Sequence, residues 1–132
     1  MTNEYSKKEV EEGNVLAPRF DSAGMIPAIV TDVLSGAVLM LAWMNAGALG
    51  KSIETGEAWF WSRSRQCLWH KGATSGQTQQ IQEIRIDCDQ DAVWLKVRMP
   101  AESGCCHTGR AGCFYRLISN QPGGPVLQAE SK

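Results

Sequence analysis

The chain has 132 residues, which is enough for one domain with a substantial core. Its formal net charge is −1, from 13 basic and 14 acidic residues. This balance argues against general attraction to nucleic acid or to membranes, and the sequence has no apolar run long enough to span a bilayer. The first residues are charged and lack the apolar segment of a secretion signal, so we expect a cytoplasmic protein.

The two ends of the sequence are polar and set the expected domain boundaries. Residues 1–18 predict a flexible N-terminal arm, with a short helix around Tyr5–Glu12. Residues 119–132 are rich in Pro, Gly and polar side chains and predict a disordered tail. We therefore assign residues 19–118 to a single folded domain.

The first half of this domain begins with strands and continues into a helix. Ile26–Val33 and Ala37–Trp43 are apolar and partly β-branched, which predicts a hairpin. Asn45 is a good N-cap for a helix that ends near Thr55, and Gly56 is typical of the residue after a helix.

The second half is also rich in strand patterns. Ala58–Arg63 predicts a strand, whereas residues 64–78 lack periodicity and predict a functional loop. Residues 84–88 and 93–97 alternate between apolar and polar side chains and predict a second hairpin. With a final strand at 114–118, the expected fold is α+β, with a mostly antiparallel sheet and one main helix.

Three carboxylates lie around the turn of the second hairpin. Alternation along the predicted strand places Asp87 and Asp89 on one face and Cys88 on the other. Carboxylate oxygens, with Asp91 joining from the turn, suit Mg²⁺, whereas thiolates suit zinc. We therefore expect two separate metal sites. A solvated acidic turn without a metal is the alternative.

The thiols point to a zinc site with an open position. Cys88, Cys106 and Cys113 do not form the paired C-x₂₋₄-C spacing of a closed structural site. Three protein ligands with a free fourth position are typical of catalytic zinc, which lowers the pKa of a bound water. His107 is either a fourth ligand, which would make the site structural, or a proton shuttle beside Cys106. We expect the second arrangement, with His107 as a catalytic residue.

A third group of polar side chains has the composition of a phosphate-binding site, with guanidinium, ammonium and hydroxyl groups near glycines. Ordinary solvated surface cations are the alternative. The candidate substrate-binding residues are Arg63, Arg65, Lys71, Thr74, Ser75 and Arg110.

Six segments in this order resemble the phosphoribosyl-AMP cyclohydrolase family, whose members open the adenine ring in histidine biosynthesis. They extend from Phe20 to Arg116 and read FDSAGMIPAIVTD, VLMLAWMN, WFWSRSR, LWHKGATSG, IRIDCDQDA and CHTGRAGCFYR. Some positions depart from the family pattern: Ala73 replaces a Glu, Ala111-Gly112 replaces Arg-Ser, and Cys105 is an additional thiol.

The resemblance implies a homodimer whose active sites lie between the subunits, with a small nucleotide as substrate. The implied reaction is hydrolysis of the N1–C6 bond of phosphoribosyl-AMP by a zinc-activated hydroxide, which gives the formimino-aminoimidazole-carboxamide ribotide. The resemblance also implies that zinc is shared between subunits, with Cys88 coming from the partner chain. The implied ligands are Cys88, Cys106 and Cys113 for zinc and Asp87, Asp89 and Asp91 for Mg²⁺.

Two other functions remain as alternatives. A zinc-dependent purine deaminase also attacks the adenine ring, but its H-x-E and P-C-x-x-C motifs do not occur in this sequence. A non-catalytic, zinc-stabilised binding module would need four protein ligands on the metal. Release of ammonia would identify the first, and a closed metal coordination shell would identify the second.

Overall fold

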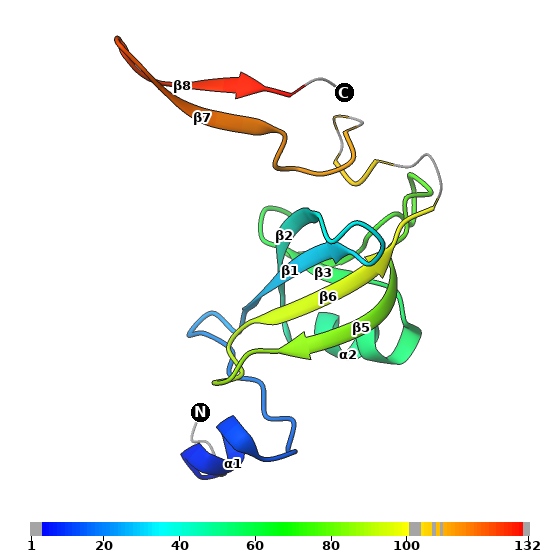
Figure 1. Ribbon diagram of the computed structural model, residues 1–132. Coiled ribbons are helices and arrows are strands. Elements are labelled where there is room, and N and C mark those ends of the chain that lie inside the picture. Colours follow the sequence, from blue (N-terminus) through cyan, green and yellow to red (C-terminus); the bar gives the residue numbers. More distant parts are fainter. Residues whose placement is uncertain (1–3, 101–103, 107, 109, 131–132) are drawn as a thin grey trace.

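The computed structural model describes residues 4–100, 104–106, 108 and 110–130 (Figure 1). The candidate catalytic residue His107 lies outside the described residues. The expected α+β class with mostly antiparallel pairing is confirmed. The elements, in chain order, are α1 (Lys7–Glu12), β1 (Ile26–Asp32), β2 (Val38–Met44), α2 (Ala46–Thr55), β3 (Trp59–Ser62), β4 (Cys67–His70), β5 (Gln80–Ile86), β6 (Val93–Arg98), β7 (Arg116–Gln121) and β8 (Gly124–Ala129).

A four-stranded sheet in the order β2-β1-β6-β5 forms the centre of the fold. The pairs β1/β2 and β5/β6 are antiparallel hairpins, as expected, but β1 and β6 run parallel. The two ends of this sheet are distinct. At the carboxylate end, β5 leads into Asp87 and β6 begins at Val93. At the thiol end, β6 leaves the sheet at Arg98 and β2 begins at Val38.

The core lies between one face of this sheet and a layer formed by α2 and β3, which stand behind the sheet in Figure 1. Val30, Leu95 and Phe60 are fully buried there. The ends of α2 are those that the sequence predicts. The Asn45 side chain accepts a hydrogen bond from the backbone N–H of Ala48 at 2.8 Å, and Gly56 ends the helix with φ of 75°.

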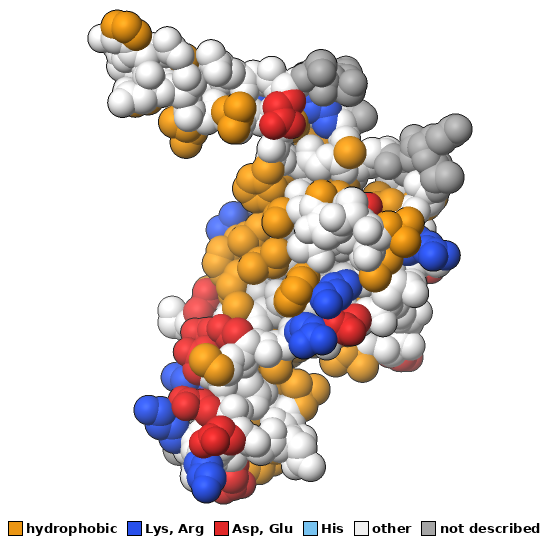
Figure 2. Space-filling view, in the orientation of Figure 1, with side chains coloured by type: hydrophobic (Ala, Val, Ile, Leu, Met, Phe, Trp, Pro, Cys, Tyr) orange, Lys and Arg blue, Asp and Glu red, His pale blue; other side chains and the backbone are white. Residues whose placement is uncertain are grey.

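The opposite face of the sheet, which we call the outer face, carries apolar side chains that no other element of the described residues covers. Ile29 pairs with Leu41 on β2 and with Trp94 on β6, so the three side chains lie together. They are 39%, 48% and 38% exposed, respectively. Figure 2 shows hydrophobic side chains gathered over this part of the sheet. Half-exposed apolar side chains in a group are typical of a surface that binds a partner.

The segment 64–78, expected to be a loop, contains β4. This strand pairs with β3 across a tight turn, in which Gln66 adopts a left-handed φ of 53°. Four residues are too few to show an alternating pattern, so the strand escapes detection in the sequence. The loop that follows depends on Gly72, because a Cβ atom there would lie 2.2 Å from the backbone of Gln77 and Thr78.

The C-terminal segment also differs from the expected disordered tail. The strand expected at 114–118 is β7 and starts at Arg116, and β7 and β8 form a hairpin in which Gln121 pairs with Gly124. Pro122 and Gly123 are therefore turn residues between two strands. Figure 1 shows this hairpin standing apart from the central sheet.

Within the described ranges, neither helix is long and apolar enough to cross a membrane.

Candidate active site

The three aspartates at the carboxylate end come together as the sequence predicts. One oxygen from each of Asp87, Asp89 and Asp91 lies within 4.8 Å of the others. The reason differs from the expected strand alternation, because β5 stops at Ile86 and the aspartates lie in the following turn. Asp87 Oδ1 accepts the backbone N–H groups of Asp91 at 2.9 Å and of Ala92 at 3.2 Å, which closes this turn. We call residues 87–92 the carboxylate loop.

The electrostatics of the carboxylate loop show that its negative charges are crowded. A hydrogen bond with Asp89, then one with Asp87, raises the pKa of Asp91 to about 6. Burial acts to raise the pKa of Asp87, but hydrogen bonds from Asp91 and from backbone N–H groups outweigh it and lower this pKa. Without a cation, the cluster therefore takes up a proton more readily than separate aspartates do.

This donor set fits a small divalent cation. Clustered carboxylate oxygens are the ligands that Mg²⁺ prefers, and a bound cation would offset the negative charge of the three aspartates. Mg²⁺ is usually held by few carboxylates and keeps several waters, which suits an exposed loop open to substrate. Asp87, Asp89 and Asp91 would hold it.

The second donor set lies at the other end of the sheet. It consists of the thiols of Cys105, Cys106 and Cys113, which we call the thiol cluster. The loop that carries it packs on β2, because the backbone N–H of Cys113 donates to the carbonyl of Leu39 at 2.6 Å. Cys105 and Cys106 are 1% and 5% exposed. Gly112 allows the close approach, since a Cβ atom there would lie 3.2 Å from the carbonyl oxygen of Val38.

The thiols in this cluster differ in acidity. The side chain and backbone amide of Thr108 lower the pKa of Cys106. Cys113 is exposed as a whole residue, but partial burial of its thiol, together with neighbouring Cys105 and Cys106, raises its pKa to about 12. The Lys71 ammonium acts to lower the pKa of all three thiols. Such soft donors fit zinc, which displaces thiol protons when it binds.

Cys88 does not join the other two predicted zinc ligands within this chain. It is exposed in the carboxylate loop, whereas Cys106 and Cys113 lie at the thiol end, beyond β6. Six strand residues separate the ends by roughly 20 Å, and Figure 1 shows the β5–β6 turn and the segment after β6 at opposite sides of the sheet. Among the described residues, the aspartates are the one group of three or more potential ligands within 4.8 Å.

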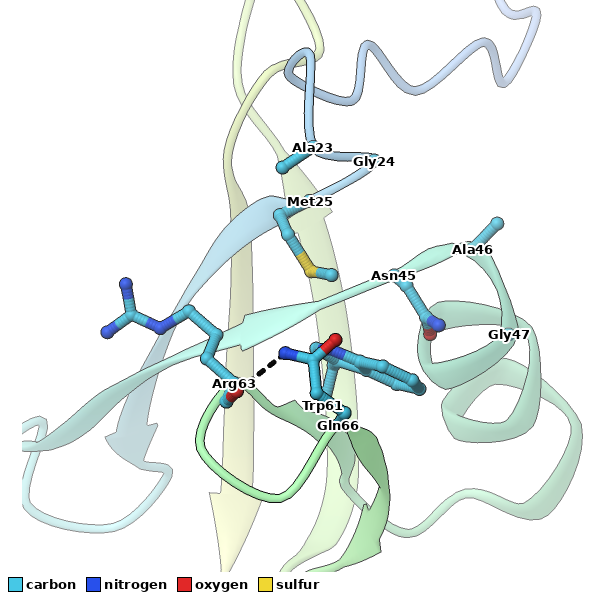
Figure 3. A pocket seen from close by; sticks show the side chains of 9 residues that line it. All are labelled: Ala23, Gly24, Met25, Asn45, Ala46, Gly47, Trp61, Arg63 and Gln66. Carbon is cyan, nitrogen blue, oxygen red and sulfur yellow. Dashed lines mark hydrogen bonds between the residues drawn. The ribbon is translucent and has the colours of Figure 1, made fainter.

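A pocket of about 640 Å³ opens beside the carboxylate end, between the residues before β1, the start of α2 and the β3–β4 turn. Figure 3 shows Met25, Asn45 and Trp61 around it, with Arg63 at one side. The Arg63 guanidinium lies 5.0 Å from the centre of the Trp43 ring. A cation, an indole and the N-terminus of a ten-residue helix suit a phosphorylated aromatic ligand.

The other candidate substrate-binding residues are distributed over both ends of the molecule. Arg65 is exposed beside the pocket, whereas Thr74 and Ser75 are exposed in the loop after β4. The Arg110 guanidinium stacks on Tyr115 at 4.0 Å. Lys71 is only 8% exposed, and its Nζ donates to the carbonyl of Cys105 at 2.6 Å, so this ammonium belongs to the thiol cluster.

Sequence reasoning missed two buried glutamines that support these clusters. Gln79 is fully buried and donates to the sulfur atoms of Cys105, at 3.4 Å, and Met40. Gln90, between two of the aspartates, is 4% exposed. Neither has a sequence signal, because glutamine is normally a surface residue.

Comparison with known proteins identifies the chain. The fold and the site define a small α+β protein with two donor sets of opposite chemistry, one of carboxylates and one of thiols. The family model described as phosphoribosyl-AMP cyclohydrolase matches residues 40–115. The chain belongs to the phosphoribosyl-AMP cyclohydrolase family.

Curated relatives with the same description match this chain over most of their lengths. A phosphoribosyl-AMP cyclohydrolase of Chelativorans sp. (strain BNC1) is 54% identical over 121 residues, 92% of this chain and 87% of the relative. That of Bradyrhizobium diazoefficiens is 55% identical over 90% of this chain and 84% of the relative. That of Brucella abortus (strain S19) is 53% identical over 95% and 90%, respectively. The match therefore includes both donor sets and the pocket.

Proposed function

We propose that this protein hydrolyses the N1–C6 bond of phosphoribosyl-AMP in histidine biosynthesis. Family membership carries the proposal, and relatives more than half identical over about nine-tenths of the chain bear this activity in their names. The aspartates and thiols support it, because ring opening needs an activated water and a means to hold two phosphates. The chain offers donors for both tasks.

The proposed active site is shared by two copies of the chain. Cys88 and the pair Cys106–Cys113 lie at opposite ends of β6, so a single chain does not close a site with all three thiols. Two copies related by a two-fold axis can place the carboxylate end of one chain beside the thiol end of the other. Each of the two sites would then contain Cys88 and the aspartates of one copy and Cys106 and Cys113 of its partner.

The surface offers room for such a partner. The outer face exposes Ile29, Leu41 and Trp94 between the two ends. The β7–β8 hairpin carries Ile118, which is 80% exposed, and Leu127, its cross-strand neighbour. A two-stranded hairpin alone is barely stable in water. Packing of the outer face and the hairpin against a second copy would bury these side chains and support the proposed homodimer.

Within this site the residues of the chain have distinct tasks. When bound, zinc supplies Lewis acidity toward a water, and Mg²⁺ supplies charge that anchors phosphate or orders a water. The Lys71 ammonium offsets the negative charge of the thiolates. Trp61 offers a stacking surface in the pocket, and Arg63 offers a guanidinium for phosphate. His107, next to Cys106 in sequence, is assigned the transfer of protons to and from the ring.

Arg63 gives a test of the pocket as a substrate site. Arg63→Ala should raise the KM for phosphoribosyl-AMP by on the order of tenfold with a smaller change in kcat, since a charged hydrogen bond is worth about 1.5–3 kcal/mol. Steady-state kinetics at saturating metal measure both constants. Lys51→Ala is the control, because Lys51 is an exposed cation that stacks on Trp59 outside the pocket. An unchanged KM in Arg63→Ala would remove the pocket from the proposed substrate site.

The reaction itself is tested with purified full-length protein, phosphoribosyl-AMP and Mg²⁺. The ultraviolet change that accompanies loss of the intact purine reports ring opening, and a coupled assay reports ammonia. We expect ring opening without ammonia, loss of activity when zinc is stripped and recovery when zinc is added back. Ammonia release would indicate a deaminase. An inactive, zinc-loaded protein with four protein ligands on the metal would indicate a binding module.

A further inference from the structure

Gln90 connects the carboxylate loop to the N-terminal arm. Its backbone adopts a left-handed φ of 59°, which is uncommon for a residue other than Gly or Asn. Its side chain is 4% exposed, although it lies between Asp89 and Asp91 in an otherwise exposed loop. Surrounding contacts must therefore hold this residue in place.

Those contacts come from the N-terminal arm. Gln90 Nε2 donates to the carbonyl oxygens of Val10 at 2.9 Å and Val15 at 3.0 Å. Gln90 Oε1 accepts the backbone N–H of Ala17 at 2.8 Å, and the Gln90 carbonyl accepts that of Arg19 at 2.7 Å. Both amide N–H groups and the amide oxygen of the side chain therefore have partners in the arm.

Helix α1 and its cap order the part of the N-terminal arm that contacts Gln90. Ser6 and Glu9 form a capping box at the start of α1, and Val10 is the buried residue of this helix, at 7% exposure. Helix α1 has six residues, too few to be stable alone. The sequence predicts a flexible arm, but in the structure residues 10–19 are fastened to the carboxylate loop.

The loop side of this contact leads directly to the aspartates. The backbone N–H of Gln90 donates to the carbonyl of Asp87 at 3.0 Å, and the next N–H, that of Asp91, donates to Asp87 Oδ1. The position of Gln90 therefore sets the direction in which Asp89 and Asp91 leave the backbone. Three carboxylates that repel one another need such support to stay within 4.8 Å.

We propose that the N-terminal arm is a clamp which, through Gln90 as a positioning residue, holds the carboxylate loop in its cation-binding conformation. This inference rests on the proposed function, since it takes the three aspartates as the Mg²⁺ site. Arm and cation are then thermodynamically linked: a docked arm raises cation affinity, and a bound cation stabilises the docked arm to the same extent.

The test measures binding of Mn²⁺, as a probe for Mg²⁺, to the full-length protein by electron paramagnetic resonance, without substrate. Gln90→Met keeps the length of the side chain but removes its three hydrogen bonds, and it should weaken Mn²⁺ binding by on the order of tenfold. Val10→Ser loosens the arm without changing any residue of the loop, and it should also weaken Mn²⁺ binding. Gln66→Met is the matched control, because Gln66 also has a left-handed φ but lies in the exposed β3–β4 turn. The Gln66→Met variant should bind Mn²⁺ as tightly as the wild-type protein.

Hydrogen exchange gives the reciprocal readout. Saturating Mn²⁺ should slow exchange of the Ala17 and Arg19 amides, which donate to Gln90, and this protection should be lost in Gln90→Met. A lower melting temperature with unchanged Mn²⁺ affinity in both variants would overturn the clamp, since Gln90 would then be only structural. If Gln90→Met does not fold, Val10→Ser decides alone. Failure of the wild-type protein to bind Mn²⁺ would instead overturn the carboxylate site of the proposed function.

Discussion

Cys106→Ser should abolish zinc binding and turnover together. Cys106 is buried at the thiol end, and Thr108 lowers its pKa, so it becomes a thiolate ligand more readily than Cys105 or Cys113, whose pKa values are raised. Cys113, with a pKa of about 12, does not ionise at neutral pH without a metal to displace its proton. Loss of Cys106 should therefore empty the site, and kcat should fall by on the order of a thousandfold, because Lewis-acid stabilisation is worth several kcal/mol.

Metal analysis and steady-state kinetics on the same preparation measure this effect. Cys67→Ser is the control, because Cys67 is an exposed thiol at the start of β4, outside the proposed ligand set. It should retain zinc and activity. Full turnover by zinc-free Cys106→Ser would contradict the assignment of the thiol cluster to catalysis.

Asp89→Asn should weaken Mg²⁺ binding and leave zinc in place. The substitution removes one of three negative charges within 4.8 Å and replaces it with a weaker ligand. We expect the Mg²⁺ concentration for half-maximal activity to rise by at least about tenfold, because the cation loses the full charge of one of its three carboxylate ligands. In the metal-free protein the pKa of Asp91 should fall, because the hydrogen bond with Asp89 is the largest cause of its elevation.

Two measurements test this prediction. Activity is measured as a function of Mg²⁺ concentration, and the pKa of Asp91 is measured by NMR as a function of pH. Glu54→Gln, on the exposed surface of α2, removes one charge far from the loop in sequence and serves as the control. An unchanged Mg²⁺ dependence in Asp89→Asn, with the Asp91 pKa lowered as expected, would show that the crowded carboxylates are an acidic turn and not the Mg²⁺ site.

Local sequence signals predict much of the fold. The β1–β2 hairpin and helix α2 appear where expected, because Asn45 and Gly56 have specific roles at helix ends. The signals fail where the same residue types are compatible with two different structures. Pro122 and Gly123 predict disorder, yet they are also the residues that a hairpin turn needs, and the flanking residues form β7 and β8. The cross-strand pairing of β7 with β8, such as that of Ile118 with Leu127, distinguishes the two outcomes.

The candidate site is predictable in its residue types but not in its arrangement. The sequence predicts that the aspartates cluster, and they do, although through a turn closed by Asp87 and not through strand alternation. The parallel pairing of β1 with β6 has no local signal. Cys88 precedes β6 and Cys106 follows it, so this strand keeps the two thiols at opposite ends of one sheet. Contacts far apart in sequence, such as that of Gln90 with Val10, depend on the complete fold and leave no pattern in either segment.

In the proposed homodimer, each zinc site takes Cys88 from one chain and Cys106 and Cys113 from the other. The most direct test of this sharing is co-expression of Cys88→Ser and Cys106→Ser chains carrying different tags. Each variant alone should lack zinc and activity. In the mixture roughly half of the dimers contain both chains, and each of these has one intact site, so roughly a quarter of wild-type zinc and turnover should return.

The matched control mixes Cys106→Ser with Cys113→Ser. Both changes lie at the thiol end, so every site in the mixed dimer is defective and neither zinc nor activity should return. Recovery in the first mixture and not in the second is the result that a shared site predicts. The shared site would be contradicted if purified mixed dimers of Cys88→Ser and Cys106→Ser bound no zinc and remained inactive.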